Sequence, residues 1–173
     1  LIRNASGGEG SDIDSETLSA DESVDMWAAG YDADNNYIAD QNVTWDVTGT
    51  LDTAGYPSAP VTSTTFSPST APTSGTITAD AGGGITDATG TITVNIGALA
   101  SIIIRDAAGG GGNAVNTRTM TTDNTFTVYA AGYDGDGNFI SDQVVTWGTT
   151  PTLDPVPPGP STVAVFDPFT AGT

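Results

Sequence analysis

The stretch "AAGYDADNNYIADQNVTW" covers residues 28–45, and "AAGYDGDGNFISDQVVTW" covers residues 130–147, so the chain carries nearly the same eighteen residues twice. The copies lie 102 positions apart, and three aspartates keep their places in both. Working outward, residues 1–45 align with residues 103–147 without a gap, and 21 of these 45 positions are identical. Such a block predicts two copies of one domain, because a repeat of about 100 residues is larger than the units of a solenoid.

The alignment resumes after a loop that is two residues shorter in the second copy, with Phe66 opposite Phe166. The first copy continues past Thr73 with "SGTITADAGGGITDATGTITVNIGALA", whereas the second reaches the equivalent position at Thr173. We therefore expect a complete domain at residues 1–100 and a truncated repeat at residues 101–173.

The truncated repeat is expected to lack the last two strands of its fold. Their loss would bare the apolar face around Val145, Trp147 and Phe166, because the equivalent strands of the first copy carry alternating Ile, Ala and Val side chains. An unpaired strand edge attracts other strands. Two completions remain open: a continuation of the chain into further repeats, or strands from a neighbouring subunit.

Hydrophobic alternation predicts strands and gives no sign of helices. Alternation with period two is typical of strands that are covered on one face. From residue 24 onward, Val24, Met26 and Ala28 form the predicted core face, and Asp25, Trp27, Ala29 and Tyr31 point outward. The second copy repeats this with core-facing Phe126, Val128 and Ala130 and outward Thr127, Tyr129, Ala131 and Tyr133. Further strands are expected near residues 43–47, 61–66, 75–80 and 91–96. Many short strands, with Trp45 and Trp147 in the core, predict an all-β fold of two antiparallel β-sandwiches.

The motifs "YDADNNYIADQNVTW" and "YDGDGNFISDQVVTW" resemble the D-x-x-G-N-x-I/V…V-T-F/W core of bacterial immunoglobulin-like domains, the invasin/intimin-like repeats. The resemblance extends over nearly the whole chain, although Asn35 stands where the family and the second copy (Gly137) have glycine. It implies tandem immunoglobulin-like sandwiches in a secreted or cell-surface stalk, adhesin or fibre, and it carries no catalytic residues.

The charge of the chain excludes several classes of partner. The chain has 21 acidic residues, three arginines and no lysine, which gives a net charge of −18. Such a surface repels nucleic-acid backbones and attracts divalent cations. The chain has neither Cys nor His, so it lacks thiolate metal ligands and the commonest general base. The longest apolar run, residues 94–104, is too short to span a bilayer. Paired-carboxylate hydrolysis is the one enzymatic chemistry left, and a repeated domain without a cleft signature argues for no enzyme.

The acidic loop, residues 32–40 and their counterpart 134–142, allows two interpretations. Asp and Asn are favoured in hairpin turns, because their side chains bond to their own backbone. Alternatively, oxygen ligands at alternate positions suit a weak Ca²⁺ site. The candidate ligands are Asp32, Asp34, Asn36 and Asp40, mirrored by Asp134, Asp136, Asn138 and Asp142. The EF-hand pattern fails, because Tyr37 and Val43 occupy its Gly and Glu positions. No other cofactor is expected.

The outward aromatic residues are candidates for a binding or packing surface. They are Trp27, Tyr31, Tyr129 and Tyr133. Three interpretations are open: cover by a neighbouring loop, with Tyr37 and Phe139 folded over them, a contact between subunits, and stacking on a glycan. Asn4 and Asn42 lie in N-x-S/T sequons and are candidate glycosylation sites.

The sequence thus predicts a non-catalytic structural protein that forms an extended extracellular stalk, fibre or filament, or surface-layer element. Its expected partners are copies of itself or further immunoglobulin-like repeats, without nucleic acid or membrane insertion of this segment. The alternative is an adhesion module that binds a surface glycan or a partner protein through the exposed aromatics, with Ca²⁺ as a stabiliser.

Overall fold

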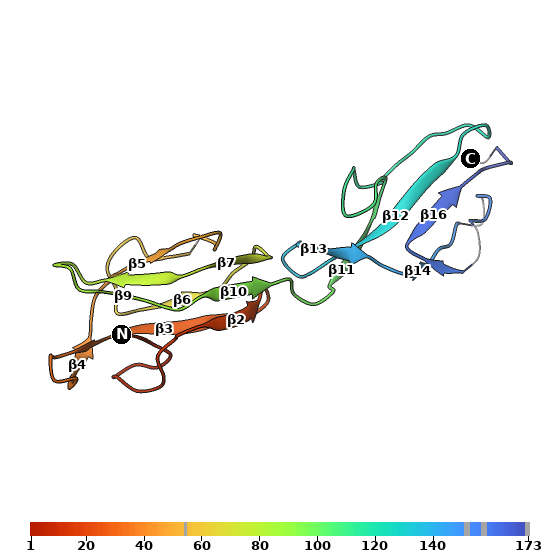
Figure 1. Ribbon diagram of the computed structural model, residues 1–173. Coiled ribbons are helices and arrows are strands. Elements are labelled where there is room, and N and C mark those ends of the chain that lie inside the picture. The colour runs from red at the N-terminus through yellow and green to blue at the C-terminus, as the bar shows by residue number, and fades with distance from the viewer. Residues whose placement is uncertain (54, 151–152, 157–158, 172–173) are drawn as a thin grey trace. The chain divides into compact units, whose positions relative to one another are not determined.

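A computed structural model describes residues 1–53, 55–150, 153–156 and 159–171. The described residues form strands and no helix, so none of them belongs to a helix that is long and apolar enough to cross a membrane. The chain divides into two compact units, Leu1–Gly97 (unit 1) and Ala98–Thr173 (unit 2), which Figure 1 shows together with their strands.

Unit 1 contains three small sheets. Its strands are β1 (Ile2–Arg3), β2 (Glu16–Ser19), β3 (Val24–Tyr31), β4 (Tyr37–Asp40), β5 (Thr44–Val47), β6 (Ser63–Phe66), β7 (Thr73–Gly75), β8 (Ile77–Asp80), β9 (Thr86–Ala88) and β10 (Ile92–Asn95). The eight-residue strand β3 pairs with β1, β4 and β6, β10 lies between β2 and β7, and β8 lies between β5 and β9. This all-β arrangement of several sheets is consistent with a β-sandwich.

Unit 2 repeats the first of these sheets strand for strand. Its strands are β11 (Ser101–Arg105), β12 (Phe126–Tyr133), β13 (Phe139–Asp142), β14 (Val145–Thr146), β15 (Pro160–Ser161) and β16 (Val163–Phe166). Strand β12 pairs with β11, β13 and β16, just as β3 pairs with β1, β4 and β6. Even the register shift of the β3–β4 pair at Gly30/Tyr31 recurs in the β12–β13 pair at Gly132/Tyr133.

One pairing departs from the predicted antiparallel pattern. Strand β10 runs parallel to β2, from Ile92 beside Glu16 to Asn95 beside Ser19. A parallel pair needs a long crossover between its strands, and here the rest of unit 1 provides it. Hydrophobic alternation within a strand does not reveal whether it pairs parallel or antiparallel, because inward and outward side chains alternate in the same way in both kinds of pair.

The segment predicted as one strand at residues 75–80 is two strands in two sheets. β7 pairs with β10, whereas β8 pairs with β5, and the chain changes sheet at Thr76. The backbone N–H of Thr76 donates to Oγ1 of Thr48 at 2.9 Å, and the backbone N–H of Thr48 donates to the Thr76 carbonyl at 2.9 Å. A Cβ on Gly75 would overlap the Thr48 carbonyl, so this crossing requires glycine.

A single apolar cluster fills unit 1. Among its members Met26, Ile77, Ile92 and Val94 are fully buried, and Trp45 is 4% exposed. The predicted core positions Ala28, Val43 and Ala79 are also buried, whereas Val24, Val47 and Ile96 are half-buried. Trp45 Nε1 donates to the Val61 carbonyl at 3.3 Å, so the indole is both packed and hydrogen-bonded.

The predicted outward face of β3 and β12 is partly wrong. Ala29 is 2% exposed, Ala131 is fully buried and Tyr133 is only 9% exposed. The reason is that a glycine-rich loop, residues 4–11 in unit 1 and residues 106–113 in unit 2, folds back over this side of each long strand. Arg3 holds the loop of unit 1 by donating to Gly10 and by an ion pair with Asp12 at 2.7 Å. Arg105 holds the equivalent loop of unit 2 through the carbonyls of residues 111 and 112, each at 2.8 Å.

A carboxylate clamp marks equivalent points in the two units. Oδ2 of Asp52 accepts from the backbone N–H groups of Ser69 and Thr70, and Oδ2 of Asp154 accepts from those of Phe169 and Thr170. Burial by itself raises the pKa of each aspartate, but the hydrogen bonds outweigh it and leave both pKa values below the ordinary value. The clamp shows that the two-residue difference between the copies lies after Asp52 and Asp154.

Phe66 and Phe166 provide a matched test of how completely the two units are packed. Phe66 is 2% exposed, whereas Phe166 is half-buried. We expect Phe66→Ala to lower the free energy of unfolding of unit 1 by about 3–5 kcal/mol, and Phe166→Ala to lower that of unit 2 by about 1–2 kcal/mol, because less area is lost from the core. Denaturant-dependent hydrogen exchange, read separately for each unit, measures both. Equal losses would contradict the packing difference.

Candidate functional site

The acidic loop between β3 and β4 is closed by its own first carboxylate. Oδ1 of Asp32 accepts from the backbone N–H groups of Asp34 at 3.0 Å and Asn36 at 2.8 Å, and Oδ2 accepts from the Asn36 amide at 3.0 Å. Asn35 has a φ of 64°, which is the left-handed conformation that turns require. These contacts form an Asx-closed hairpin turn, the first of the two interpretations of this motif.

The loop of unit 2 has the same design and is more buried. Oδ1 of Asp134 accepts from the backbone N–H groups of Asp136 at 3.1 Å and Asn138 at 2.7 Å. Asp134 is 2% exposed, whereas Asp32 is exposed. The left-handed position is Gly137, at φ 89°, so Asn35 and Gly137 support the same turn in the two units.

The predicted calcium ligands do not converge. Asp40 turns away from the loop: its Oδ2 accepts from the Gly7 N–H at 3.0 Å and its Oδ1 accepts from the Tyr37 hydroxyl at 3.1 Å. Asp142 likewise accepts from the Gly109 N–H at 2.9 Å. Among the described residues, no three acidic side chains lie close enough to hold a metal ion. Competition contributes, since the carboxylate oxygens of Asp32 and Asp40 already accept hydrogen bonds from the protein.

The two units differ at one hydrogen bond of this network. Tyr37 donates its hydroxyl to Asp40 Oδ1, but its counterpart Phe139 has no hydroxyl. Asp142 Oδ1 is buried. Because this donor is missing, it has no hydrogen-bond partner in the described part of unit 2. A buried acceptor without a donor costs free energy.

The predicted aromatic surface is largely covered within each unit. The ring of Tyr31 meets that of Tyr37 edge to face, with centroids 5.8 Å apart, and its hydroxyl donates to the Gly8 carbonyl at 3.3 Å. Tyr133 meets Phe139 at the same centroid distance. Trp27 and Tyr129 are half-buried on the same strands. These contacts favour the interpretation of cover by a neighbouring loop, with Tyr37 and Phe139 over the strand as predicted and the glycine-rich loop in addition.

Both candidate glycosylation sites are exposed. The Asn4 side chain has a structural role, because its Oδ1 accepts from the Ser11 N–H at 2.8 Å. Asp106, its counterpart in unit 2, accepts in the same way from the Asn113 N–H at 2.6 Å. Asn42 points away from the core, as alternation predicts, and lies next to buried Val43.

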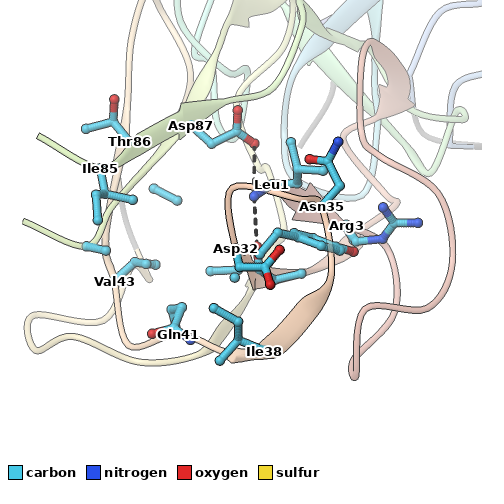
Figure 2. A pocket seen from close by; sticks show the side chains of 16 residues that line it. Leu1, Arg3, Asp32, Asn35, Ile38, Gln41, Val43, Ile85, Thr86 and Asp87 are labelled. Carbon is cyan, nitrogen blue, oxygen red and sulfur yellow. Dashed lines mark hydrogen bonds and ion pairs between the residues drawn. The ribbon is translucent and has the colours of Figure 1, made fainter.

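A cavity of about 720 Å³ lies in unit 1 and was not predicted from the sequence. Its wall is formed by β1, β3, the acidic loop and the turn before β9, with Ile85 and Thr86 across from Asn35 and Arg3 in Figure 2. Ile38 and Ile85 are 62% and 72% exposed beside it. Two isoleucines outside the predicted core pattern, Ile38 in β4 and Ile85 before β9, are the only sequence signal that points here.

Unit 2 explains what kind of cavity this is. The backbone of Gly30 and Tyr31 lines the cavity, whereas the equivalent Gly132 and Tyr133 pair with Ile102 and Ser101 of β11. The Leu99 side chain also comes within 2.8 Å of a Cβ built on Gly132. The cavity is therefore a gap in a strand ladder. Asp32 and Asp87 are its carboxylates, and each already accepts a backbone hydrogen bond.

Comparison of the chain with protein-family models, with curated protein sequences and with solved structures found no match. The chain's own geometry is thus the basis for a functional proposal.

The missing hydrogen bond of Asp142 gives a matched pair of substitutions. Phe139→Tyr supplies a donor to the buried Oδ1, and we expect it to stabilise unit 2 by about 1 kcal/mol. Tyr37→Phe removes the corresponding donor in unit 1 and should destabilise that unit, by less than about 1 kcal/mol because its site is exposed. Chemical denaturation with unit-resolved hydrogen exchange measures both effects. A destabilised Phe139→Tyr variant would show that the Asp142 oxygen is satisfied in another way.

The acidic loop should loosen in acid. The side-chain hydrogen bond from Asn36, followed by that from its backbone, holds the pKa of Asp32 below its ordinary value of 3.8. Because the folded pKa is depressed, the stabilisation is complete above 3.8 and is lost as the pH falls through the lower folded value. We expect the protection factor of the Asn36 backbone N–H, which corrects for the intrinsic pH dependence of exchange, to fall in that range, as measured by NMR with a titration of the Asp32 carboxyl carbon.

Asp34→Asn is the control for this titration, because the Asp34 carboxylate accepts no hydrogen bond in the described part of the chain. It should leave Asn36 exchange unchanged, whereas Asp32→Asn should accelerate it even at neutral pH. Similar behaviour of the two variants would contradict the closing role of Asp32.

Proposed function

We propose that this chain is part of a non-catalytic structural protein that is built from tandem immunoglobulin-like domains of the invasin/intimin-like kind. Its place is an extracellular stalk, a fibre or filament, or a surface-layer element. The observation that carries the proposal is that unit 2 repeats the first sheet of unit 1 together with its loops. The register shift of the long strand, the acidic loop and the carboxylate clamp all recur at equivalent positions.

The use of the carboxylates supports a structural role. The carboxylate oxygens of Asp32, Asp40 and Asp52 accept hydrogen bonds from backbone N–H groups, and these bonds stiffen turns and loops. A glycosidase instead needs two carboxyl groups that face each other across a substrate, at about 5–10 Å. Backbone-clamping carboxylates with lowered pKa values stay ionised at neutral pH and are poor general acids.

The net charge of −18 suits an extracellular array. Like charges on neighbouring domains keep a protein with exposed strand edges soluble until a specific contact overcomes the repulsion. At about 0.15 M salt the Debye length is about 8 Å, so the repulsion acts only between close surfaces. Raising the salt concentration should therefore favour association of the chain.

One observation keeps the adhesion alternative in view. Tyr37 is 39% exposed and packs edge to face against Tyr31, so it offers an aromatic side chain to a sugar or a partner protein. In unit 2 the equivalent Phe139 is half-buried. Adhesion would therefore depend on Tyr37, whereas the structural role would not.

Surface labelling tests the proposed location. Antibodies raised against this chain should label intact cells of the source organism, and protease added outside the cells should remove the signal. Labelling that appears only after lysis would contradict an extracellular structural role.

A second experiment separates the structural role from adhesion. We expect the thermal midpoint of the chain to move by less than about 1 °C on addition of millimolar Ca²⁺, because bound ligands raise stability by mass action and the described residues hold no preformed carboxylate cluster. A glycan array should show no Tyr37-dependent binding, with Tyr37→Ala as the comparison. Binding that disappears in Tyr37→Ala would establish adhesion instead.

A further inference from the structure

Two Asp-Gly steps follow each other in the acidic loop of unit 2. They are Asp134-Gly135 and Asp136-Gly137. The acidic loop of unit 1 has no such step, because Ala33 and Asn35 occupy the two glycine positions. Glycine has no Cβ, so its backbone nitrogen can approach the side chain of the preceding aspartate more closely than that of another residue. The two loops share one fold and differ in this chemistry.

An Asp-Gly step can rearrange without an enzyme. The glycine nitrogen attacks Cγ of the aspartate while the carboxyl group is protonated. A succinimide ring forms, and the N–H hydrogen leaves with the carboxyl hydroxyl as one water. Water then adds to either carbonyl of the ring and opens it. Opening at the former main-chain carbonyl leaves the chain running through Cβ and Cγ, which is isoaspartate, with no change in mass and no oxidation or reduction.

The fold holds Asp134 out of this reaction. Its Oδ1 accepts from the backbone N–H groups of Asp136 at 3.1 Å and Asn138 at 2.7 Å, and its Oδ2 accepts from the Asn138 side-chain amide at 2.9 Å. Asp134 is 2% exposed. Ring closure must break these hydrogen bonds and turn Cγ toward its own main chain, in a place that solvent hardly reaches. Reaction at Asp134 therefore requires the loop to open first.

Asp136 has the opposite environment. Its side chain is exposed, and its carboxylate accepts no hydrogen bond from the residues that the structure describes. The attacking nitrogen, that of Gly137, donates to the Asp134 carbonyl at 3.3 Å, which is long for an N–H hydrogen bond. A Cβ built on Gly137 would meet nothing within 4 Å, so no neighbouring side chain crowds the step. Asp136 is thus free to react while the loop stays folded.

We propose that Asp136 is a site of spontaneous isoaspartate formation and that the fold protects Asp134, two residues before it. Unit 2 then carries a slowly self-modifying turn that unit 1 lacks. The inference goes beyond the structural role proposed above, because it assigns a covalent modification to one residue. It holds wherever the protein resides.

The rearrangement has a defined structural consequence. Isoaspartate adds one carbon to the main chain before Gly137 and leaves a free carboxylate on Cα of residue 136. The Asn138 N–H, which donates to Asp134 Oδ1 at 2.7 Å, lies after this insertion. The added carbon changes the spacing between this donor and its acceptor. Modification should therefore release Asn138 and loosen the hairpin between β12 and β13.

Prolonged incubation of the full 173-residue chain at mildly acidic pH tests the proposal. Liquid chromatography with electron-transfer fragmentation identifies isoaspartate at each position. In the folded chain we expect isoaspartate to form at Asp136 about tenfold faster than at Asp134, or more, because reaction at Asp134 needs local opening. In denaturant neither step is protected, and the two rates should agree within about threefold.

An exchange of one residue between the loops is the matched control. Gly137→Asn should slow the reaction at Asp136 by about tenfold or more, since a Cβ hinders ring closure. The turn should persist in this variant, because Asn35 adopts φ 64° at the same position of unit 1. Conversely, Asn35→Gly should start the reaction at Asp34, which is exposed. Gly135→Ala should leave the rate at Asp136 unchanged.

Hydrogen exchange of the incubated chain gives an independent readout. The Asn138 N–H should lose protection in proportion to the isoaspartate at Asp136, whereas the Asn36 N–H of unit 1 should keep its protection. The proposal is overturned if Asp134 reacts as fast as Asp136 in the folded chain, or if neither reacts there although both react in denaturant. An unchanged rate at Asp136 in Gly137→Asn would also overturn it.

Discussion

The covering of one apolar face by β8 and β10 is the constraint on which the rest of unit 1 depends. A two-layer β fold has no interior until the second layer is present, because each sheet supplies only one apolar face. In unit 1, Ile77, Ile92 and Val94 provide that layer, and the side chains opposite them lose nearly all contact with solvent. In unit 2, the same kinds of residues remain in contact with water. Similar sequences thus reach different degrees of burial, because burial is a property of the pair of sheets.

The strand edges follow the same logic. β5 and β2 exist as strands only because β8 and β10 pair with them, and the matched segments of unit 2 are shorter or irregular. By contrast, the β12 sheet retains its full pairing, since its partners β11, β13 and β16 all lie within unit 2. One sheet of each unit is therefore self-sufficient, and the other is completed by the closing strands.

The acidic residues do a different task from the one that their spacing first indicates. Asp32 and Asp134 close turns, Asp52 and Asp154 clamp a later loop, and Asp40 holds the glycine-rich loop. In each case a carboxylate accepts from backbone N–H groups that a loop leaves unpaired. A chain with few long side chains and no disulfide gains its loop order in this way. The remaining carboxylates give the surface its charge.

The sequence by itself determined the two-fold repeat, the all-β class, the eight residues of β3 and the core positions of Met26, Trp45, Ile77 and Val94. These rest on local signals, since period two and residue identity do not depend on what lies across the sheet. Only the tertiary structure decided that Ala29 and Tyr133 are covered, that residues 75–80 belong to two sheets, and that Asp40 turns away from Asp32. Each of these depends on a contact between segments distant in the chain: a glycine-rich loop folded over a strand, a crossing at Thr76, and a hydrogen bond from Gly7. Alternation records which side of a strand is apolar, but not which segment arrives to cover the other side.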